Sequence, residues 1–317
     1  MSRGGGPLRG RMQPRPDPTG IFDLRYKAFL ETVSHLRTRL HRYCARMTGS
    51  ALDGEDAMQE ALFEAYRKIE ALEDPGALRA WMFRIAHNRC IDMLRKRAAR
   101  ERAEMAYAEE DVALPVEPAG AGHAIERLVV HLPPKERASV LLKDVFDHSL
   151  EEIADLVGST AGGVKAALSR GRAKLAALPA EPAAVPEIRR DPDLEKLLRH
   201  YVALFNRRDW DGVRALISAD AQLRVADCFK GRLADSPYFS EYAKLGMAWR
   251  LAVGAIDGEP VVIVLKPGRD GWEPAYPVRI QARDGIIDGI SDYYPCPWMM
   301  PAADIILLAE PEPERSP

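Results

Sequence analysis

Residues 22–102 carry apolar positions at the spacing typical of helices, with almost no Pro or Gly inside the periodic runs. The segment 74–76 (DPG) is the clear interruption. After it, Leu78, Met82 and Ile85 recur at helical spacing and are expected to face a core, because they share one face. A second, mostly polar face of the same helix carries Arg84, Asn88, Ile91 and Arg95. The pattern predicts an all-α unit with an amphipathic, basic last helix.

Residues 123–178 predict a second, smaller helical unit. Ser149 and Glu152 form a capping box, in which each side chain satisfies a backbone N–H of the other residue. The helix that follows is expected to stop at Gly158, and a basic helix containing Val164 and Leu168 comes next. A short helix, a tight turn with glycine and a basic second helix indicate a helix-turn-helix. An ordinary helical hairpin is the alternative.

From residue 193 onward the spacing of apolar positions is first typical of helices and then typical of strands. Residues 194–205 carry an apolar stripe at helical spacing, and a short helix containing Trp210, Val213, Leu216 and Ile217 follows. Two pairs of strand-like runs then surround Asp-Gly dipeptides: 250–256 with 261–266, and 278–283 with 286–293. Asp-Gly between such runs favours a tight hairpin. Helices followed by antiparallel strands predict an α+β domain with a curved antiparallel sheet.

Composition shifts divide the chain into three domains. The expected segments are a flexible tail (1–21), a helical domain (22–102), an acidic linker (103–122), the helix-turn-helix domain (123–178), a Pro-rich linker (179–192), the α+β domain (193–300) and a tail (301–317). Four prolines between 179 and 192 forbid a continuous helix there. The fold class is therefore multidomain, with two all-α domains and one α+β domain.

The charge of the chain is sorted, although its sum is close to zero. The 317 residues contain 45 Lys+Arg and 47 Asp+Glu, a net charge of −2, which by itself argues against a nucleic-acid partner. Residues 25–49 hold six basic residues and one acidic, residues 51–74 hold two and eight, and residues 79–102 hold eight and two. Alternating stripes indicate one surface for phosphates and another for a protein partner.

Several classes of protein are not expected. No apolar run approaches the about 18 residues of a membrane helix, and the N-terminus lacks the apolar centre of a secretory signal. The four cysteines lie far apart and form no CxxC pair, so neither a metal site nor a disulfide framework is predicted. We expect a cytoplasmic protein without a cofactor.

Three ordered motifs resemble a known family. Residues 53–61 (DGEDAMQEA) resemble the core-binding motif of bacterial sigma factors. Residues 78–88 (LRAWMFRIAHN) with 91–95 (IDMLR) resemble their promoter-melting segment, and residues 132–137 (LPPKER) with the helix-turn-helix resemble their fourth region. Their order and spacing resemble the extracytoplasmic-function group of the sigma-70 family, which keeps regions two and four. The resemblance covers residues 22–178.

This resemblance implies roles for individual residues. Docking on the clamp helices of the largest subunit of core RNA polymerase falls on Asp53, Glu55, Asp56, Gln59 and Glu60. Binding of the −10 element falls on Arg84, Asn88, Arg95, Lys96 and Arg97. Binding of the −35 element falls on Ser159, Thr160, Lys165, Ser169, Arg170 and Arg172. Region four would also contact the flap of the second-largest subunit. One departure is Ala167, where relatives carry an arginine that contacts DNA.

Residues 193–300 resemble the SnoaL-like and nuclear-transport-factor-2-like domains, through the helix stripe, residues 205–217 (FNRRDWDGVRALI) and the strand pattern. The resemblance implies a pocket, for which Asp227, Asp292 and Tyr293 are candidates; we expect it to be noncatalytic. The leading interpretation is a sigma factor whose C-terminal domain regulates it in cis, with a small molecule or a protein as a further regulator. The alternatives are a polymerase-independent DNA-binding regulator and a bifunctional protein that binds or converts a small molecule.

Overall fold

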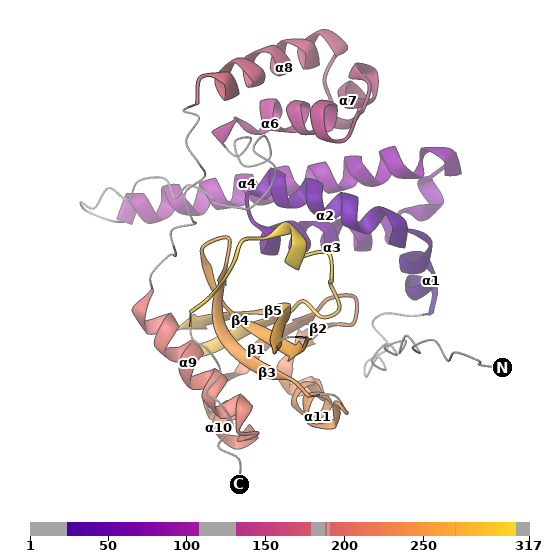
Figure 1. Ribbon diagram of the computed structural model, residues 1–317. Coiled ribbons are helices and arrows are strands. Elements are labelled where there is room, and N and C mark those ends of the chain that lie inside the picture. Colours follow the sequence, from indigo (N-terminus) through magenta and orange to yellow (C-terminus); the bar gives the residue numbers. More distant parts are fainter. Residues whose placement is uncertain are drawn as a thin grey trace, which may run out of the picture.

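The computed structural model describes residues 24–107, 131–178, 188, 191–246, 248–269 and 271–308. The predicted tail 1–21, most of both predicted linkers and the end of the chain lie outside these residues. The described residues form a first helical unit (24–107), a second helical unit (131–178) and a C-terminal domain (191–308). The first helical unit lies between the other two (Figure 1).

The first helical unit contains four α-helices. They are α1 (Leu24–Thr32), α2 (Ser34–Thr48), α3 (Ala51–Arg67) and α4 (Leu78–Tyr107), with short 3-10 turns η1 (Ile69–Ala71) and η2 (Pro75–Ala77) between α3 and α4. The predicted interruption is confirmed, since Asp74 accepts a hydrogen bond from the Gly76 N–H before α4 begins. Gly54 lets α2 and α3 approach closely, because a Cβ at this position would lie 2.4 Å from the Ala45 nitrogen. The acidic helix α3 is thus held tightly against α2.

The second helical unit consists of α6 (Pro134–Val140), a π-helical turn η4 (Leu141–Val145), α7 (Leu150–Val157) and α8 (Ala161–Ala176). Both hydrogen bonds of the predicted capping box are present, and Gly158 ends α7 in the left-handed conformation. The helix-turn-helix prediction is therefore confirmed. This unit packs on the first: the Phe83 ring lies 5.6 Å from that of Phe146 and 5.5 Å from that of His148. The two units share one apolar core.

The C-terminal domain begins with α9 (Pro192–Asn206) and α10 (Trp210–Ala215) and has a third helix, α11 (Tyr238–Lys244). Its strands are β1 (Ile217–Val225), β2 (Phe229–Arg232), β3 (Arg250–Ile256), β4 (Glu259–Pro267), β5 (Trp272–Arg283), β6 (Ile286–Asp292) and β7 (Ile305–Leu307). Two more 3-10 turns are η5 (Leu233–Asp235) and η6 (Met300–Ala302). The strand order is β2-β1-β6-β5-β4-β3-β7.

The α+β class and both Asp-Gly hairpins are confirmed, with Asp257 and Asp284 at positive φ in the turns. The expectation of a purely antiparallel sheet was wrong, because β1 pairs with β6 in parallel. Ile217 begins β1 and does not extend the second helix. Residues 305–307, expected in a tail, form β7 on the edge of the sheet beside β3.

The sheet is covered on both faces. On β3 and β4, Val253, Val262 and Val264 face the apolar core formed with α9 and α11, whereas Ala252 and Ile263 face the opposite way. This second face packs on the start of α3 through Leu52. Because side chains alternate along a strand, double coverage requires an almost continuous apolar run, which residues 261–265 (VVIVL) provide. The C-terminal domain therefore uses the first helical unit to bury one face (Figure 1).

Candidate functional site

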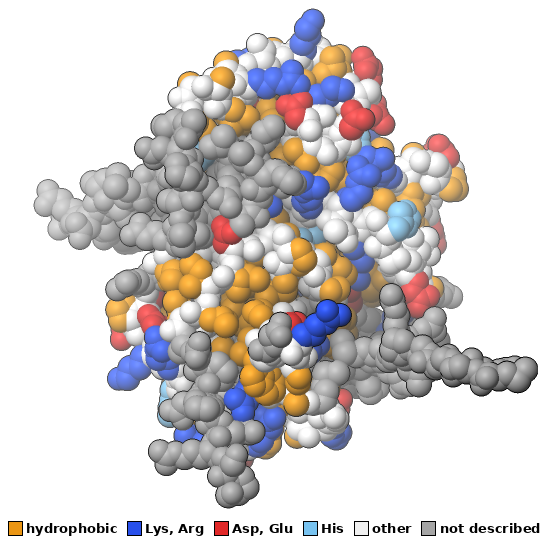
Figure 2. All heavy atoms as spheres, viewed as in Figure 1, with side chains coloured by type: hydrophobic (Ala, Val, Ile, Leu, Met, Phe, Trp, Pro, Cys, Tyr) orange, Lys and Arg blue, Asp and Glu red, His pale blue; other side chains and the backbone are white. Residues whose placement is uncertain are grey.

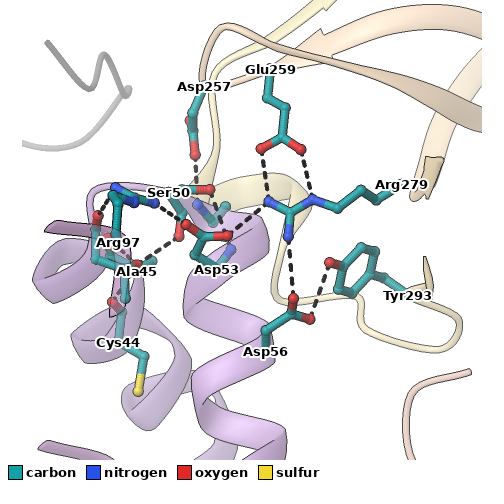
Figure 3. A network of polar contacts seen from close by, with 12 residues as sticks. Cys44, Ala45, Ser50, Asp53, Asp56, Arg97, Asp257, Glu259, Arg279 and Tyr293 are labelled. Atoms are coloured by element: carbon teal, nitrogen blue, oxygen red, sulfur yellow. Dashed lines mark hydrogen bonds and ion pairs between the residues drawn. The ribbon is translucent and has the colours of Figure 1, made fainter. Parts of the chain in front are cut away.

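The guanidinium of Arg279 on β5 lies against the acidic face of α3 (Figure 3). It donates to Asp53 Oδ1 at 2.9 Å and to Asp56 Oδ2 at 3.2 Å. Glu259, in the same domain as Arg279, accepts two further hydrogen bonds at 2.7 Å. Arg279 is 8% exposed, so this network is shielded from water and from dissolved salt. The pKa of Asp56 is raised, mainly by burial, although Arg224 and Arg279 oppose the shift.

Both aspartates have additional partners. Arg224 on β1 forms an ion pair with Asp56, and the Tyr293 hydroxyl donates to the same carboxylate at 3.1 Å. Arg97 on α4 forms an ion pair with Asp53. Three of these four cationic or hydroxyl partners, Arg279 included, come from the C-terminal domain. The acidic face of α3 is therefore satisfied mainly by that domain.

Glu55, the next acidic residue on α3, is 0% exposed. Trp298 donates its indole N–H to Glu55 Oε2 at 2.7 Å, and the Cys296 thiol donates to Oε1 at 3.3 Å. The Gln59 amide donates to Oε1 at 2.6 Å. A carboxylate at this depth needs such donors, because an unpaired buried charge is strongly unfavourable.

Asp257, in the turn between β3 and β4, contacts the N-terminus of α3. Its Oδ2 accepts from the Ala51 N–H at 2.7 Å, and its Oδ1 accepts from the Asp304 N–H at 3.0 Å. Ala51 is the first residue of α3, where backbone N–H groups lack partners within the helix and attract negative charge. Burial raises the pKa of Asp257 to about 6. The C-terminal domain thus contacts α3 at its end as well as along its face.

A separate ion pair joins α2 to the C-terminal domain. Arg37 pairs with Asp227, and its guanidinium lies 4.5 Å from the centre of the Trp298 ring. Burial raises the pKa of Asp227 above its ordinary value, although Arg37 opposes the shift. Among the described residues, no group of three or more His, Cys, Asp or Glu side chains is placed to hold a metal ion. None of the described helices is long and apolar enough to cross a membrane.

Comparison with known families matches two stretches. Residues 32–100 match the Sigma-70 region 2 family and residues 122–175 match Sigma-70, region 4. The chain is 32% identical to the ECF RNA polymerase sigma factor SigM of Mycobacterium tuberculosis, over 48% of this chain and 76% of SigM. It is also 32% identical to SigW of Bacillus subtilis, over 47% of this chain and 87% of SigW. The chain belongs to the ECF RNA polymerase sigma factor family.

Another sigma factor of this family, SigG of Mycobacterium tuberculosis, is 31% identical over 63% of this chain, which spans 61% of the length of SigG. Among solved structures, the extracytoplasmic function sigma factor SigJ of Mycobacterium tuberculosis is 20% identical over 83% of this chain and 95% of SigJ, with a TM-score of 0.34. A putative ketosteroid isomerase from Kribbella flavida is 22% identical over 39% of this chain and 84% of that chain, with a TM-score of 0.27.

In this sigma factor, the five predicted docking residues lie on α3 but differ in accessibility. Asp53, Glu55, Asp56 and Gln59 are all engaged in the contacts described above, while Glu60 is exposed. On α4, Arg84, Asn88, Arg95 and Lys96 are exposed, whereas Arg97 turns back to Asp53. The predicted −10 residues are thus accessible except for Arg97.

The predicted −35 residues lie at the start and along one side of α8. Thr160 accepts a hydrogen bond from the Gly163 N–H and caps the helix, next to Ser159, and Lys165 and Ser169 are exposed. Arg170 pairs with Glu136 of α6, and Arg172 pairs with Asp144 of η4. Figure 2 shows Lys and Arg side chains over this part of the surface.

Ala167, the departure from the family pattern, is 0% exposed and lies on the inner side of α8. The consequence of this departure for DNA binding stays a prediction.

The three candidate pocket residues of the C-terminal domain do not share a pocket. Asp227 faces α2, and Tyr293 faces α3. Asp292 is buried inside the domain, where its Oδ2 accepts from the hydroxyls of Tyr238 and Tyr242 and its Oδ1 accepts from the Tyr294 N–H. Asp292 is the last residue of β6 and Tyr293 follows it directly, and the two side chains face different parts of the molecule.

Sequence reasoning missed the residues of the C-terminal domain that contact α3. They are Arg224, Asp257, Arg279, Cys296 and Trp298. The available signal was the apolar run of β4, which indicates a strand that is buried on both faces and therefore has a second layer packed against it.

Proposed function

We propose that this chain is a sigma factor that binds core RNA polymerase through α3 and directs it to promoters through α4 and α8. The family matches and the acidic face of α3 support this proposal. The exposed cations of α4 and α8 are suited to phosphates, since most protein–DNA hydrogen bonds go to the backbone. We place its action in the cytoplasm, with the polymerase and the chromosome, and propose no bond chemistry of its own.

We further propose that the C-terminal domain inhibits this sigma factor in cis. The observation that carries this proposal is that Arg279 and Arg224 form ion pairs with Asp53 and Asp56, the same carboxylates that we propose as contacts for the polymerase. One carboxylate face cannot be covered by β1 and β5 and by the polymerase at the same time. We call the arrangement with the C-terminal domain on α3 the closed form.

Opening the closed form separates buried charges, which is strongly unfavourable unless new partners replace the old ones. Core polymerase, by supplying cations to Asp53 and Asp56, would offset the loss of Arg279 and Arg224. A partner that leaves these carboxylates unpaired would not offset this loss and would not open the chain. Asp53 and Asp56 would therefore hold the chain in the inhibited closed form, and only a partner that pairs with them, such as core polymerase, would open it.

The docking role is tested at Glu60, which is exposed in the closed form and lies outside the Arg279 network. We expect Glu60→Arg to weaken binding to core polymerase by about tenfold, because charge reversal places like charges together at the interface. Equilibrium binding of the labelled full chain to core polymerase measures this effect. Glu70→Arg, an exposed reversal in η1, is the matched control and should bind normally. Equal binding by both variants, with DNA binding retained, would instead favour a polymerase-independent regulator.

The closed form should be favoured by acid. Burial raises the pKa of Asp56, Asp227 and Asp257, that of Asp257 to about 6. In the open form these carboxyls regain water, and Asp257 would titrate near its ordinary value of about 3.9. The closed form therefore holds protons that the open form releases. Its advantage is full below about pH 4 and is lost as the pH rises to about 6.

Energy transfer between dyes at exposed positions Glu73 and Arg283 measures opening across this range. Each titrating group changes the opening equilibrium by at most about tenfold per pH unit. We expect the open fraction to increase from pH 4.5 to pH 7, and to increase less in Asp257→Asn. A pH-independent signal in the unaltered chain would show that these carboxyls are not linked to opening.

A further inference from the structure

The motif 132–137 (LPPKER) leads into α6, and its last two residues face different elements. Arg137 donates to the carbonyls of Leu132 and of Met47, near the end of α2, so it faces the first helical unit. Glu136 instead faces α8, the helix that carries most of the predicted −35 residues. Its side chain is only 8% exposed. A carboxylate at this depth needs charged or hydrogen-bonding partners, and α8 supplies them.

Both oxygens of Glu136 accept hydrogen bonds from cations of α8. Arg170 Nε donates to Oε1 at 3.0 Å, and Lys174 Nζ donates to Oε2 at 2.8 Å. The two cations are four positions apart and therefore lie on the same side of the helix. Their side chains are nevertheless 57% and 52% exposed. One buried carboxylate thus holds two cations that remain accessible to a ligand.

Gly171 allows this arrangement, because it lets α8 approach α6 closely. A Cβ at this position would lie 2.9 Å from Val140 Cγ2 and 3.5 Å from Glu136 Cβ. A larger residue would push the two helices apart. The close contact brings the carboxylate of Glu136 within reach of the residues on either side of the glycine along α8.

The other flank of α8 has a different balance of charge. Arg172 lies two positions after Arg170 and so about 200° farther around the helix. Asp144 of η4 pairs with Arg172 alone. On the Glu136 flank, two cations and one carboxylate leave a local charge of +1, whereas on the Asp144 flank the two charges cancel.

The three cations also differ in the donors that remain free. Arg170 uses only its Nε, so the two terminal nitrogens of its guanidinium make no hydrogen bond to the described residues. These nitrogens form a planar edge that can pair with two phosphate oxygens. The ammonium of Lys174 has three donors and gives one to Glu136. Arg172 gives both Nε and Nη2 to Asp144, so its side edge is occupied.

We propose that Glu136 is a positioning residue for binding of the −35 element: it holds Arg170 and Lys174 ready for phosphates of one DNA strand. Arg172 contributes less, because Asp144 neutralises it. Long side chains lose rotamer freedom when DNA orders them, and holding them in advance reduces this loss. The inference rests on the proposed promoter binding through α8 and is independent of inhibition in cis.

The variant Glu136→Gln tests this role in the full chain assembled with core polymerase. Equilibrium binding is measured on a cognate promoter and on the same DNA with a scrambled −35 element. We expect the ratio of the two affinities to decrease by about tenfold, because a neutral amide no longer holds both cations. Affinity for the scrambled DNA should not decrease, since the change removes a negative charge near phosphates. Glu151→Gln, at an exposed carboxylate of α7, is the matched control and should keep the ratio.

The salt dependence of promoter binding tests the difference between the two flanks. Each phosphate contact contributes about 0.9 to the slope of log affinity against log salt concentration. Arg170→Gln should therefore reduce the slope by about one. Asp144→Asn should increase it by about one, because Arg172 then becomes available to a phosphate. These two variants also decide the question if thermal unfolding shows that Glu136→Gln destabilises the second helical unit.

An unchanged affinity ratio in a folded Glu136→Gln chain would overturn the positioning role. A decrease in affinity for both DNAs would assign Glu136 a structural role only. Unchanged slopes in Arg170→Gln and Asp144→Asn would overturn the difference between the flanks. If the unaltered chain with core polymerase does not distinguish the intact from the scrambled −35 element, the proposed promoter binding through α8 itself fails. If it does, and Glu136→Gln keeps the ratio, the positioning role fails alone.

Discussion

The variant Arg279→Glu is expected to bind core RNA polymerase at least about tenfold more tightly than the unaltered chain, because the reversed charge expels the C-terminal domain from α3. The new carboxylate would face Asp53, Asp56 and Glu259 in a site where Arg279 is 8% exposed. Four like charges cannot share a buried position. Equilibrium binding to core polymerase and run-off transcription from a cognate promoter measure the gain.

Arg283→Glu is the matched control, since Arg283 lies on the same strand but is exposed, with Asp288 3.8 Å away. It should leave affinity and transcription unchanged. Circular dichroism of both variants checks that the C-terminal domain stays folded, because Arg279 also pairs with Glu259 of its own domain. A folded Arg279→Glu chain that opens, as judged by energy transfer, and yet binds polymerase no better would contradict inhibition in cis.

The elements that sequence could predict are those determined by local chemistry. The Ser149–Glu152 capping box, the left-handed Gly158 and the turns at Asp257 and Asp284 depend on residues within a few positions of one another. The apolar stripe of α9 predicted a helix because its spacing is local as well. These features placed the helix-turn-helix and both hairpins correctly.

The contacts that decide function are not local. Arg279 and Asp53 are 226 positions apart, and β1 pairs in parallel with β6, which lies far along the chain. The C-terminal segment 193–300 holds 14 basic and 15 acidic residues, so its charge count concealed two arginines that meet α3. The acidic segment 51–74 was predicted to be a protein-binding surface. In the structure, the C-terminal domain of the same chain contacts this surface through Arg224 and Arg279.

A change at Asp56 separates two roles of the acidic face of α3, which are binding to core polymerase and contact with the C-terminal domain. We expect Asp56→Arg to weaken binding to core polymerase by about 100-fold or more, because it removes a docking carboxylate and adds a like charge. The same change repels Arg224 and Arg279 and so opens the chain. If an open chain does not bind core polymerase, the C-terminal domain cannot be the cause, because it no longer covers α3. Glu70→Arg again serves as the control.

The double variant Asp56→Arg/Arg279→Glu restores opposite charges across the domain contact with reversed polarity. We expect energy transfer between positions 73 and 283 to return toward the closed value, because residues in contact are energetically coupled. Binding to polymerase should stay lost, since the polymerase surface is unchanged. Closure that is not recovered would show that Arg279 and Asp56 are not coupled. Polymerase binding that is recovered together with closure would show that Asp56 maintains the shape of α3 and does not itself contact the polymerase.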